Sequence, residues 1–219
     1  MKPLVIFGCG EIGQLAHFYF TTDTDRPLAG FTVDAAYRTA DTFCGLPVVP
    51  FEEVTRHFPP ETHDLFVAFS YKQINRLRAA KVTEARAKGY ALATYCSSHA
   101  TVLTREPIGD NCFILEDNTV QPFVKIGHNV TLWSGNHIGH HSVIEDDCFI
   151  TSHVVISGGV RIGPKCFIGV NATLRDHITV GESSIIGAGA LILGDMPPKS
   201  VYKADGTVRA TITSDRLRL

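Results

Sequence analysis

Four histidines lie close together in the second half of the chain, and one of them is spaced for acyl-transfer chemistry. They are His137, His140, His141 and His153. Gly158 follows His140 by eighteen residues, three periods of a six-residue repeat. If the chain forms coils of eighteen residues, His140 would lie beneath the backbone N–H of Gly158, which no side chain covers. An imidazole titrates near neutral pH and serves as a general base, and a bare N–H stabilises an oxyanion.

Two other interpretations of these histidines stay open. A histidine at the corner of a repeat is often only a surface residue, and this applies more to His141 and His153 than to His140. A metal site fits the spacing poorly, because the β-helix carbonic anhydrases hold zinc with two histidines five residues apart. No histidine pair within residues 102–192 has that spacing, so we predict that the protein binds no metal.

The first residues have the spacing of a phosphate-binding turn. An apolar strand over residues 2–7 runs into the pattern G-x-G-x-x-G, and a helix follows over residues 11–20. Such a turn presents backbone N–H groups to a phosphate at a helix N-terminus. Asp34 ends the next predicted strand, at a distance that suits a ribose or base contact. The alternative is a turn that only packs helix on strand. The predicted binding residues of the turn are Gly8, Gly10, Glu11, Ile12 and Gly13.

Polar residues also follow the predicted strand over residues 65–69. Ligands of parallel sheets bind at the carboxyl ends of the strands, so this segment is a candidate substrate site; a solvated helix start is the alternative. The candidates are Tyr71, Lys72, Asn75 and Arg78. A last strand is expected near residues 90–95. Only one half of a dinucleotide fold fits before residue 100, which favours a mononucleotide or a nucleotide-sugar over NAD.

Aliphatic residues recur at every sixth position from Val102 to Ile192 without interruption. Amphipathic helices repeat at three and four residues, and exposed strands alternate at two. A period of six therefore predicts a parallel β-helix in which three hexads make one triangular coil. Each aliphatic residue is expected to point inward with the small residue four positions later. Glycine often follows the aliphatic residue, where we expect it to turn the corner with a positive φ.

Composition limits the partners and the compartment. The chain of 219 residues has a formal net charge of −2 and no basic patch, so we predict no nucleic acid and no membrane partner. No apolar run is long enough to span a bilayer, and the first twenty residues do not resemble a signal peptide. Cys112, Cys148 and Cys166 occupy the small inward position, which predicts buried free thiols. We therefore expect a cytoplasmic protein.

A half-Rossmann unit followed by a hexad prism resembles the PglD/NeuD-type bacterial sugar acetyltransferases of the hexapeptide-repeat superfamily, and is similar to the perosamine N-acetyltransferases. The resemblance implies an α/β half-Rossmann (βαβαβ) domain over residues 1–96. It implies a left-handed parallel β-helix over residues 97–194 and a C-terminal tail over residues 195–219. In that family the prisms form a homotrimer with active sites between subunits. The N-terminal domain holds the nucleotide-sugar, and acetyl-CoA lies in a groove between two prisms.

The same resemblance assigns roles to individual residues. His140 matches the catalytic base and Gly158 the oxyanion donor. The family has an acid directly after the base, where this chain has His141; Glu145 or Asp146 is a candidate replacement for that acid, and His141 is an alternative base. The family's Asn-x-x-Arg matches Asn75 and Arg78, and Trp133 and Asn136 are expected at the sugar. Expected coenzyme A contacts are His153, Gly158, Val170 and Ala188, with Arg209, Arg216 and Arg218 in the tail.

The residue motifs and the family resemblance together imply an acetyl-CoA-dependent N-acetyltransferase. It is expected to act on a nucleotide-linked amino (dideoxy) sugar in surface glycan biosynthesis, such as that of lipopolysaccharide O-antigen. Two alternatives stay open. One is a sugar O-acetyltransferase of the sialic-acid type, because an amine and a hydroxyl use the same base and oxyanion donor. The other is a trimeric scaffold without catalysis.

Overall fold

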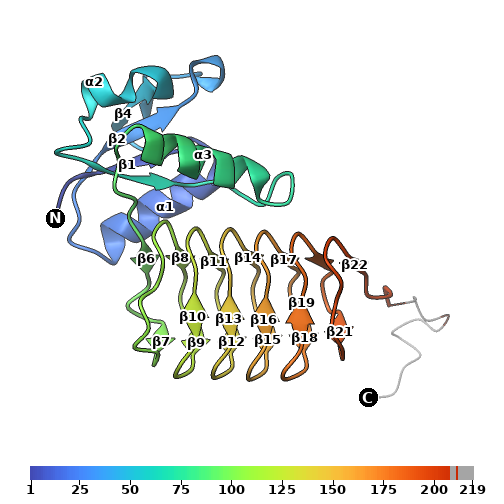
Figure 1. The fold of residues 1–219 in the computed structure, drawn as a ribbon. Coiled ribbons are helices and arrows are strands. Elements are labelled where there is room, and N and C mark those ends of the chain that lie inside the picture. The colour runs from blue at the N-terminus through green and yellow to red at the C-terminus, as the bar shows by residue number, and fades with distance from the viewer. Residues whose placement is uncertain (208–210, 212–219) are drawn as a thin grey trace.

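The computed structural model describes residues 1–207 and residue 211, and it divides the chain into an α/β domain and a long three-sided prism (Figure 1). The prism extends away from the domain as a stack of coils, with helix α3 lying over the first coils. The predicted coenzyme A contacts Arg209, Arg216 and Arg218 lie outside the described residues. Within those residues, no helix has the length and apolarity that crossing a bilayer would require.

The N-terminal domain is built on a five-stranded sheet in the order β3-β4-β2-β1-β5. Strands β1, β2, β4 and β5 are parallel, and β3 and β4 form an antiparallel hairpin. The apolar run of β1 is buried along its whole length because the sheet is covered on both faces. The elements are β1 (Leu4–Phe7), α1 (Glu11–Thr22), β2 (Leu28–Val33), η1 (Ala35–Tyr37), β3 (Thr42–Phe43), β4 (Leu46–Pro50), η2 (Phe51–Glu53), α2 (Val54–His57), β5 (Asp64–Val67) and α3 (Arg76–Ala87).

Each hexad of the prism forms a two-residue strand and a corner. Strands eighteen residues apart pair in parallel, as His137 does with Val155, so the predicted β-helix is confirmed. The three sheets have the orders β22-β20-β17-β14-β11-β8-β6, β21-β18-β15-β12-β9-β7 and β10-β13-β16-β19. The strands are β6 (Tyr95–Cys96), β7 (Thr101–Val102), β8 (Phe113–Ile114), β9 (Thr119–Val120), β10 (Lys125–Ile126), β11 (Thr131–Leu132), β12 (His137–Ile138), β13 (Val143–Ile144), β14 (Phe149–Ile150), β15 (Val155–Ile156), β16 (Arg161–Ile162), β17 (Phe167–Ile168), β18 (Thr173–Leu174), β19 (Thr179–Val180), β20 (Ile185–Ile186), β21 (Leu191–Ile192) and β22 (Val201–Tyr202).

The inward residues of the hexads make one continuous core along the prism. Cys112, Cys148 and Cys166 are fully buried in it as free thiols, as the sequence predicts. Burial raises the pKa of the Cys112 thiol to about 12 and raises the pKa of Cys148 well above its usual value. The Cys112 and Cys148 thiols therefore stay protonated and pack as small apolar groups.

The corners turn at a different residue from the one expected. At the corners from Asn111 to Gly189 the positive φ falls three positions after the aliphatic residue, as at Asn129 (57°) and His141 (59°), and not at the glycine that directly follows it. Glycine is needed there because the backbone of the next coil lies against it: a Cβ on Gly139 would lie 2.5 Å from the nitrogen of Gly158. The expectation that these glycines adopt a positive φ is therefore wrong, and close packing between coils explains them instead.

The domain and the prism share a core. Tyr95 and Phe113 of the prism pack with Phe20 and Phe66 of the domain. Leu92 bridges in parallel to Leu65 of β5, as expected for a last strand of the domain. From Tyr95 the chain already belongs to the prism, because β6 pairs with β8. At the other end, β22 pairs with β20, beyond the predicted end of the β-helix at residue 194. The resulting contact surface fixes how the two parts lie against each other.

Candidate active site

His140 lies directly against Gly158, as the eighteen-residue spacing predicts. His140 is on the corner after β12, and Gly158 is on the same corner one coil later. A Cβ on Gly158 would lie 2.6 Å from Cε1 and 2.7 Å from Nε2 of the imidazole, so a larger residue would exclude the ring. Among the described residues, the Gly158 N–H donates no hydrogen bond, whereas the next N–H, of Gly159, donates to the His140 carbonyl at 2.8 Å. The site thus combines an exposed imidazole with a free backbone donor.

His141 contacts the same imidazole. Its Nδ1 lies 3.1 Å from Nδ1 of His140, and its ring lies 4.7 Å from the ring of Phe123, on the preceding coil. The backbone N–H of His140 donates to the Gln121 side chain at 2.8 Å. Both histidines are exposed to solvent, so the pair is held by its neighbours and is still open to a substrate.

The two acids considered as replacements for the family's acid are engaged elsewhere. The Glu145 carboxylate pairs with Arg161. The Asp146 carboxylate accepts from the backbone N–H of His128 at 2.7 Å. Neither has a bond to His140 in the described structure, and the side chain that does contact the imidazole is His141.

An open groove lies on the sheet that begins after the histidine corner, and neither His140 nor His141 lines it. It has a volume of ≈ 490 Å³ and follows the outer face of β10, β13 and β16. Val143, the first residue of β13, lines the groove and follows His141 by two positions. The lining carries both charges, through Lys125, Arg161 and Glu145. Residues of the groove are Lys125, Ile126, Gly127, Val143, Ile144, Glu145, Asp146, Arg161 and Pro164.

The expected coenzyme A residues, apart from Gly158, lie on another edge of the prism. His153, Val170 and Ala188 occupy the corners that precede β15, β18 and β21, whereas His140 is on the corner that follows β12. The imidazole of His153 lies against Gly135, where an added Cβ would be 2.5 Å from its Nδ1. Within one chain, the sheet containing β12 and β15 therefore separates the predicted base from these residues.

Two of the three glycines in the turn are required by close packing, and the third faces open space. Gly8 has a φ of 124°, and a Cβ there would lie 2.8 Å from the Ala68 carbonyl oxygen. A Cβ on Gly13 would overlap the backbone of Gly8. At Gly10, by contrast, an added Cβ would meet nothing within 4 Å of the described structure. Packing thus accounts for Gly8 and Gly13 and leaves Gly10 facing open space, as a binding turn requires. Of the other two turn residues, Glu11 is exposed and Ile12 packs against the domain core.

Asp34 is paired with a residue that sequence analysis missed. Lys81 on α3 donates from Nζ to Asp34 Oδ1 at 2.8 Å, and its Nζ lies 5.5 Å from the centre of the Phe51 ring. The predicted site residues lie near the ends of strands, whereas Lys81 belongs to a helix further along the chain. Together the pair presents a cation and an anion at the carboxyl edge of the sheet.

The loop after β5 crosses to the prism. The ring of Tyr71 is exposed and lies 4.6 Å from that of Phe167 and 5.2 Å from that of Phe149, and Lys72 is exposed beside it. Three consecutive residues, Gln73–Asn75, have positive φ, a conformation that non-glycine residues adopt rarely. The loop thus turns sharply and directs Asn75 toward the prism.

Asn75 and Arg78 join the domain to the prism, which differs from their predicted role in substrate binding. Asn75 is fully buried and donates from Nδ2 to the Cys166 carbonyl at 3.1 Å. Arg78 is 2% exposed and donates to the carbonyls of Cys148 and Asp147 at 2.9 and 3.1 Å. Burial lowers the pKa of its guanidinium to about 10, so it remains charged at neutral pH. Because these polar atoms are turned away from solvent, the structure assigns both residues to the interface.

Asn136 and Trp133 are also held inside the structure. Asn136 is 1% exposed; it donates to Asn118 at 3.0 Å and accepts from the Val154 N–H at 2.8 Å. This places it in an asparagine ladder within the prism corner and not at a sugar, which corrects the expectation. Trp133 is half-buried, packs on the domain core, and has its ring 6.3 Å from that of Phe149.

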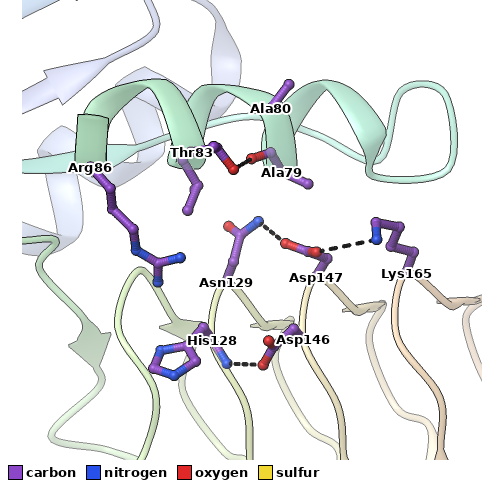
Figure 2. Close-up of a pocket in the computed structure, with 10 residues that line it drawn as sticks. Ala79, Ala80, Thr83, Arg86, His128, Asn129, Asp146, Asp147 and Lys165 are labelled. Atoms are coloured by element: carbon purple, nitrogen blue, oxygen red, sulfur yellow. Dashed lines mark hydrogen bonds and ion pairs between the residues drawn. The ribbon is translucent and has the colours of Figure 1, made fainter. Parts of the chain in front are cut away.

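Figure 2 shows a second cleft, of ≈ 300 Å³, between α3 and the prism corners on a third edge. Arg86 pairs with Asp110 at 2.6 Å, and Asp147 accepts from Asn129 at 2.7 Å. Its charged groups already have partners, and of the residues considered for the site only Asp146, the candidate replacement for the family's acid, lines it. The lining residues are Ala79, Ala80, Val82, Thr83, Arg86, His128, Asn129, Asp146, Asp147 and Lys165. Over the described part of the chain, no group of three or more His, Cys, Asp and Glu side chains is arranged to hold a metal ion.

Comparison with known proteins identifies the repeats. The family model described as bacterial transferase hexapeptide (six repeats) matches residues 124–158 and 159–194. Galactoside O-acetyltransferase of Escherichia coli is 32% identical over 93 residues, which are 42% of this chain and 43% of that protein. An acyl-[acyl-carrier-protein]–UDP-N-acetylglucosamine O-acyltransferase of Gloeothece citriformis is 30% identical over 97 residues, 42% of this chain and 35% of that protein. The chain thus spans less than half of either curated relative.

Solved structures match nearly the whole chain. A perosamine N-acetyltransferase variant from Caulobacter crescentus, in complex with CoA and GDP-perosamine, superposes with a TM-score of 0.82 at 23% identity, covering 93% of this chain and 94% of that one. WeeI from Acinetobacter baumannii superposes with a TM-score of 0.77 at 18% identity, covering 92% and 96%. The acetyltransferase domain of PglB from Neisseria gonorrhoeae, in complex with acetyl coenzyme A, gives 0.59 at 24% identity, covering 93% and 96%. Residues 124–194 therefore match the hexapeptide-repeat model, and the chain as a whole has the fold of these solved acetyltransferases, as the sequence predicts.

Proposed function

We propose that the protein transfers an acetyl group from acetyl-CoA to the amino group of a nucleotide-linked amino sugar, in surface glycan biosynthesis. The observation that carries the proposal is the contact between the His140 imidazole and Gly158, whose N–H is free within the described residues. A base and an oxyanion donor on one corner are the two groups that acyl transfer needs. Solved proteins of this fold that were crystallised with CoA and a nucleotide-sugar support the choice of substrates.

In the proposed reaction, His140 Nε2 takes a proton from the sugar amine while the amine nitrogen attacks the thioester carbonyl. The Gly158 N–H donates to the oxygen that becomes negative in the tetrahedral intermediate. The carbon–sulfur bond then breaks, and the proton held by His140 goes to the departing coenzyme A thiolate. General-base catalysis of this kind contributes about 10²–10⁴-fold to the rate.

The nucleotide is proposed to bind at the glycine turn. Gly10 faces open space, and Asp34 with Lys81 offers one acceptor and one donor at the same sheet edge. The exposed loop carrying Tyr71 and Lys72 lies after β5, at the carboxyl end of the neighbouring strand. A phosphate bound by backbone N–H groups at the start of α1 would benefit from the positive end of that helix.

A homotrimer is proposed because one chain keeps the expected site residues apart. His153, Val170 and Ala188 lie on a different edge from His140, and a second copy would bring its own edge to the histidine corner. Apolar side chains are exposed on the sheet between the two edges: Leu103, Val155, Leu191 and Leu193 are 54%, 40%, 62% and 57% exposed. Contact between copies would cover this face.

O-acetylation is the second candidate, because a galactoside O-acetyltransferase and a UDP-N-acetylglucosamine O-acyltransferase are among the curated relatives. The test is release of free thiol from acetyl-CoA with nucleotide-sugars that do or do not carry a free amine. Release with the amino sugars alone supports the proposal, and release with hydroxyl-only sugars supports O-acetylation. No release with any amino sugar would overturn it. His140→Asn is expected to lose about 10²–10⁴-fold in kcat while keeping the oligomeric state of the parent.

A further inference from the structure

We propose that His141 is a positioning residue for the base: its Nδ1 accepts the Nδ1 proton of His140 and so keeps His140 Nε2 free to take the substrate proton. This inference rests on the proposed acetyl transfer. The contact that carries it is the 3.1 Å separation of the two Nδ1 atoms. His141 touches His140 and is not required to touch substrate.

The geometry assigns different tasks to the two nitrogens of His140. The atoms of the ring nearest to a Cβ on Gly158 are Cε1 and Nε2, at 2.6 and 2.7 Å. The other nitrogen, Nδ1, is directed to His141. Nδ1 would lie 3.1 Å from the same Cβ, so the whole ring packs on Gly158. Because Nδ1 is engaged with His141, Nε2 is the ring nitrogen left to accept the substrate proton.

A hydrogen bond between two imidazole Nδ1 atoms holds one proton, and its location decides whether His140 is a base. If the proton is on His140, a neutral ring leaves Nε2 unprotonated and able to accept. If the proton is on His141, the neutral His140 ring carries its proton on Nε2 and cannot act as a base. The first arrangement requires His141 to accept, which a neutral ring protonated on Nε2 does.

A histidine partner has a consequence that an acidic partner would not have. A carboxylate beside an imidazole favours the protonated ring and raises its pKa by a unit or more. A neutral His141 orients the ring without adding that charge. One proton gained by the pair, on either ring, ends base function.

The surroundings of the pair introduce few other charges. The coil before it presents Gln121 and Phe123, and the coil after it presents Gly158 and Gly159, none of which titrates near neutral pH. The titratable and charged groups on the adjoining elements are His137 on β12, Lys125, Glu145 and Arg161 around β13, and Asp176 with His177 on the same corner, two coils after the pair.

The corner also explains why a histidine fits at position 141. The residue has a φ of 59°, a conformation in which asparagine, aspartate and histidine are enriched among non-glycine residues. The Phe123 ring lies 4.7 Å from the imidazole and restricts its movement. Asparagine and aspartate are therefore the substitutions that keep the backbone and change only the partner of His140.

The test compares four proteins by the pH dependence of kcat/KM: the parent, His141→Asn, His141→Asp and His141→Ala. We expect His141→Ala to lose about tenfold or more in kcat with an unchanged KM for the nucleotide-sugar, and His141→Asn, which can still accept from Nδ1, to recover most of it. His141→Asp is expected to move the acid limb upward by about one pH unit. His177→Ala is the matched control, because His177 has the same backbone conformation on the same edge, and its acid limb should not move.

A second measurement does not depend on turnover. Proton–nitrogen NMR of protein labelled at histidine shows which ring nitrogen of His140 carries the proton, and we expect Nδ1 in the parent and a higher pKa of His140 in His141→Asp. A parent with His140 protonated on Nε2, or variants at position 141 with the parental acid limb and kcat, would overturn the inference. If no acceptor sugar were acetylated, the proposed function would fail, and the NMR result would still decide whether His141 positions His140.

Discussion

Replacing Gly158 with alanine tests the candidate site by adding one methyl group. That methyl would lie 2.6 Å from Cε1 and 2.7 Å from Nε2 of His140, about 1 Å inside the usual contact distance between such atoms. The imidazole must therefore rotate away from the corner. The backbone N–H of residue 158 is kept, so the substitution removes the base from its place without removing the oxyanion donor.

The magnitude follows from the role of the displaced ring. A general base contributes about 10²–10⁴-fold, so Gly158→Ala is expected to lower kcat by about two to four orders of magnitude. Because His140 is exposed and its ring can move into solvent, we expect little change in the unfolding temperature. The double variant with His140→Asn should lose no more than His140→Asn alone, because both changes remove the same group.

The assay is thiol release from acetyl-CoA under saturating sugar, with thermal unfolding measured on the same samples. Gly194→Ala is the matched control, because an added Cβ there meets nothing within 4 Å of the described residues, and its kcat should stay within about twofold of the parent. A Gly158→Ala protein with kcat within threefold of the parent would refute the reasoning. So would a double variant whose losses multiply.

Three further predictions follow from the contacts. Gly10→Ala is expected to raise the KM for the nucleotide-sugar without lowering the melting temperature, whereas Gly13→Ala, whose Cβ would overlap backbone, should destabilise the fold; equal melting temperatures in a thermal scan would contradict this. Arg78→Ala removes the charged hydrogen bonds to the carbonyls of Asp147 and Cys148, of which Cys148 keeps the Thr131 N–H as a donor. It should cost about 2–4 kcal/mol in urea unfolding, against less than about 0.5 for the exposed Arg76→Ala on the same helix. Hydrogen bonds from Ser98, chiefly its side chain, and from the Tyr95 hydroxyl lower the pKa of Asp23 to about 2; because this pKa lies below its unfolded value of about 3.9, the stabilisation is present above pH 4 and is lost as the pH falls toward 2. The melting temperatures of the parent and Asp23→Asn should therefore differ at pH 7 and converge by pH 2.

The parts of the site that repeat with the coil were predictable from sequence. The six-residue period, anchored at residues such as Ile138, places His140 and Gly158 on one corner, and the structure has them in contact. The setting of Arg78 was not predictable, because its partners are carbonyls about seventy residues away and backbone acceptors have no sequence signature. Lys81 was missed for a similar reason: only the packing of α3 against the sheet brings it to Asp34.

The residue that adopts positive φ at each corner could not be deduced from the positions of glycine alone. Glycine usually marks positive φ, as it does at Gly135, Gly159 and Gly189. The glycines that directly follow the aliphatic residues instead mark places where the next coil lies too close for a Cβ, as at Gly139. Asparagine, aspartate and histidine take up most of the left-handed positions instead. The identity of a residue shows that a position is constrained, and only the packing shows which constraint applies.

The contacts of Asn75 and Arg78 restrict the length of the substrate that the proposed site can accept. Arg78 binds the carbonyl of Cys148, at the end of the coil that contains His140, and Asn75 binds the carbonyl of Cys166, at the end of the coil that contains Gly158. The α/β domain is thereby fixed to the two layers of the prism that hold the proposed catalytic groups. Within one subunit, the fold therefore fixes the distance along the prism axis between the glycine turn and those groups. A substrate whose two ends are separated by one more or one fewer linking unit would reach a neighbouring layer, roughly 4.8 Å away, where no equivalent histidine and free N–H have been described.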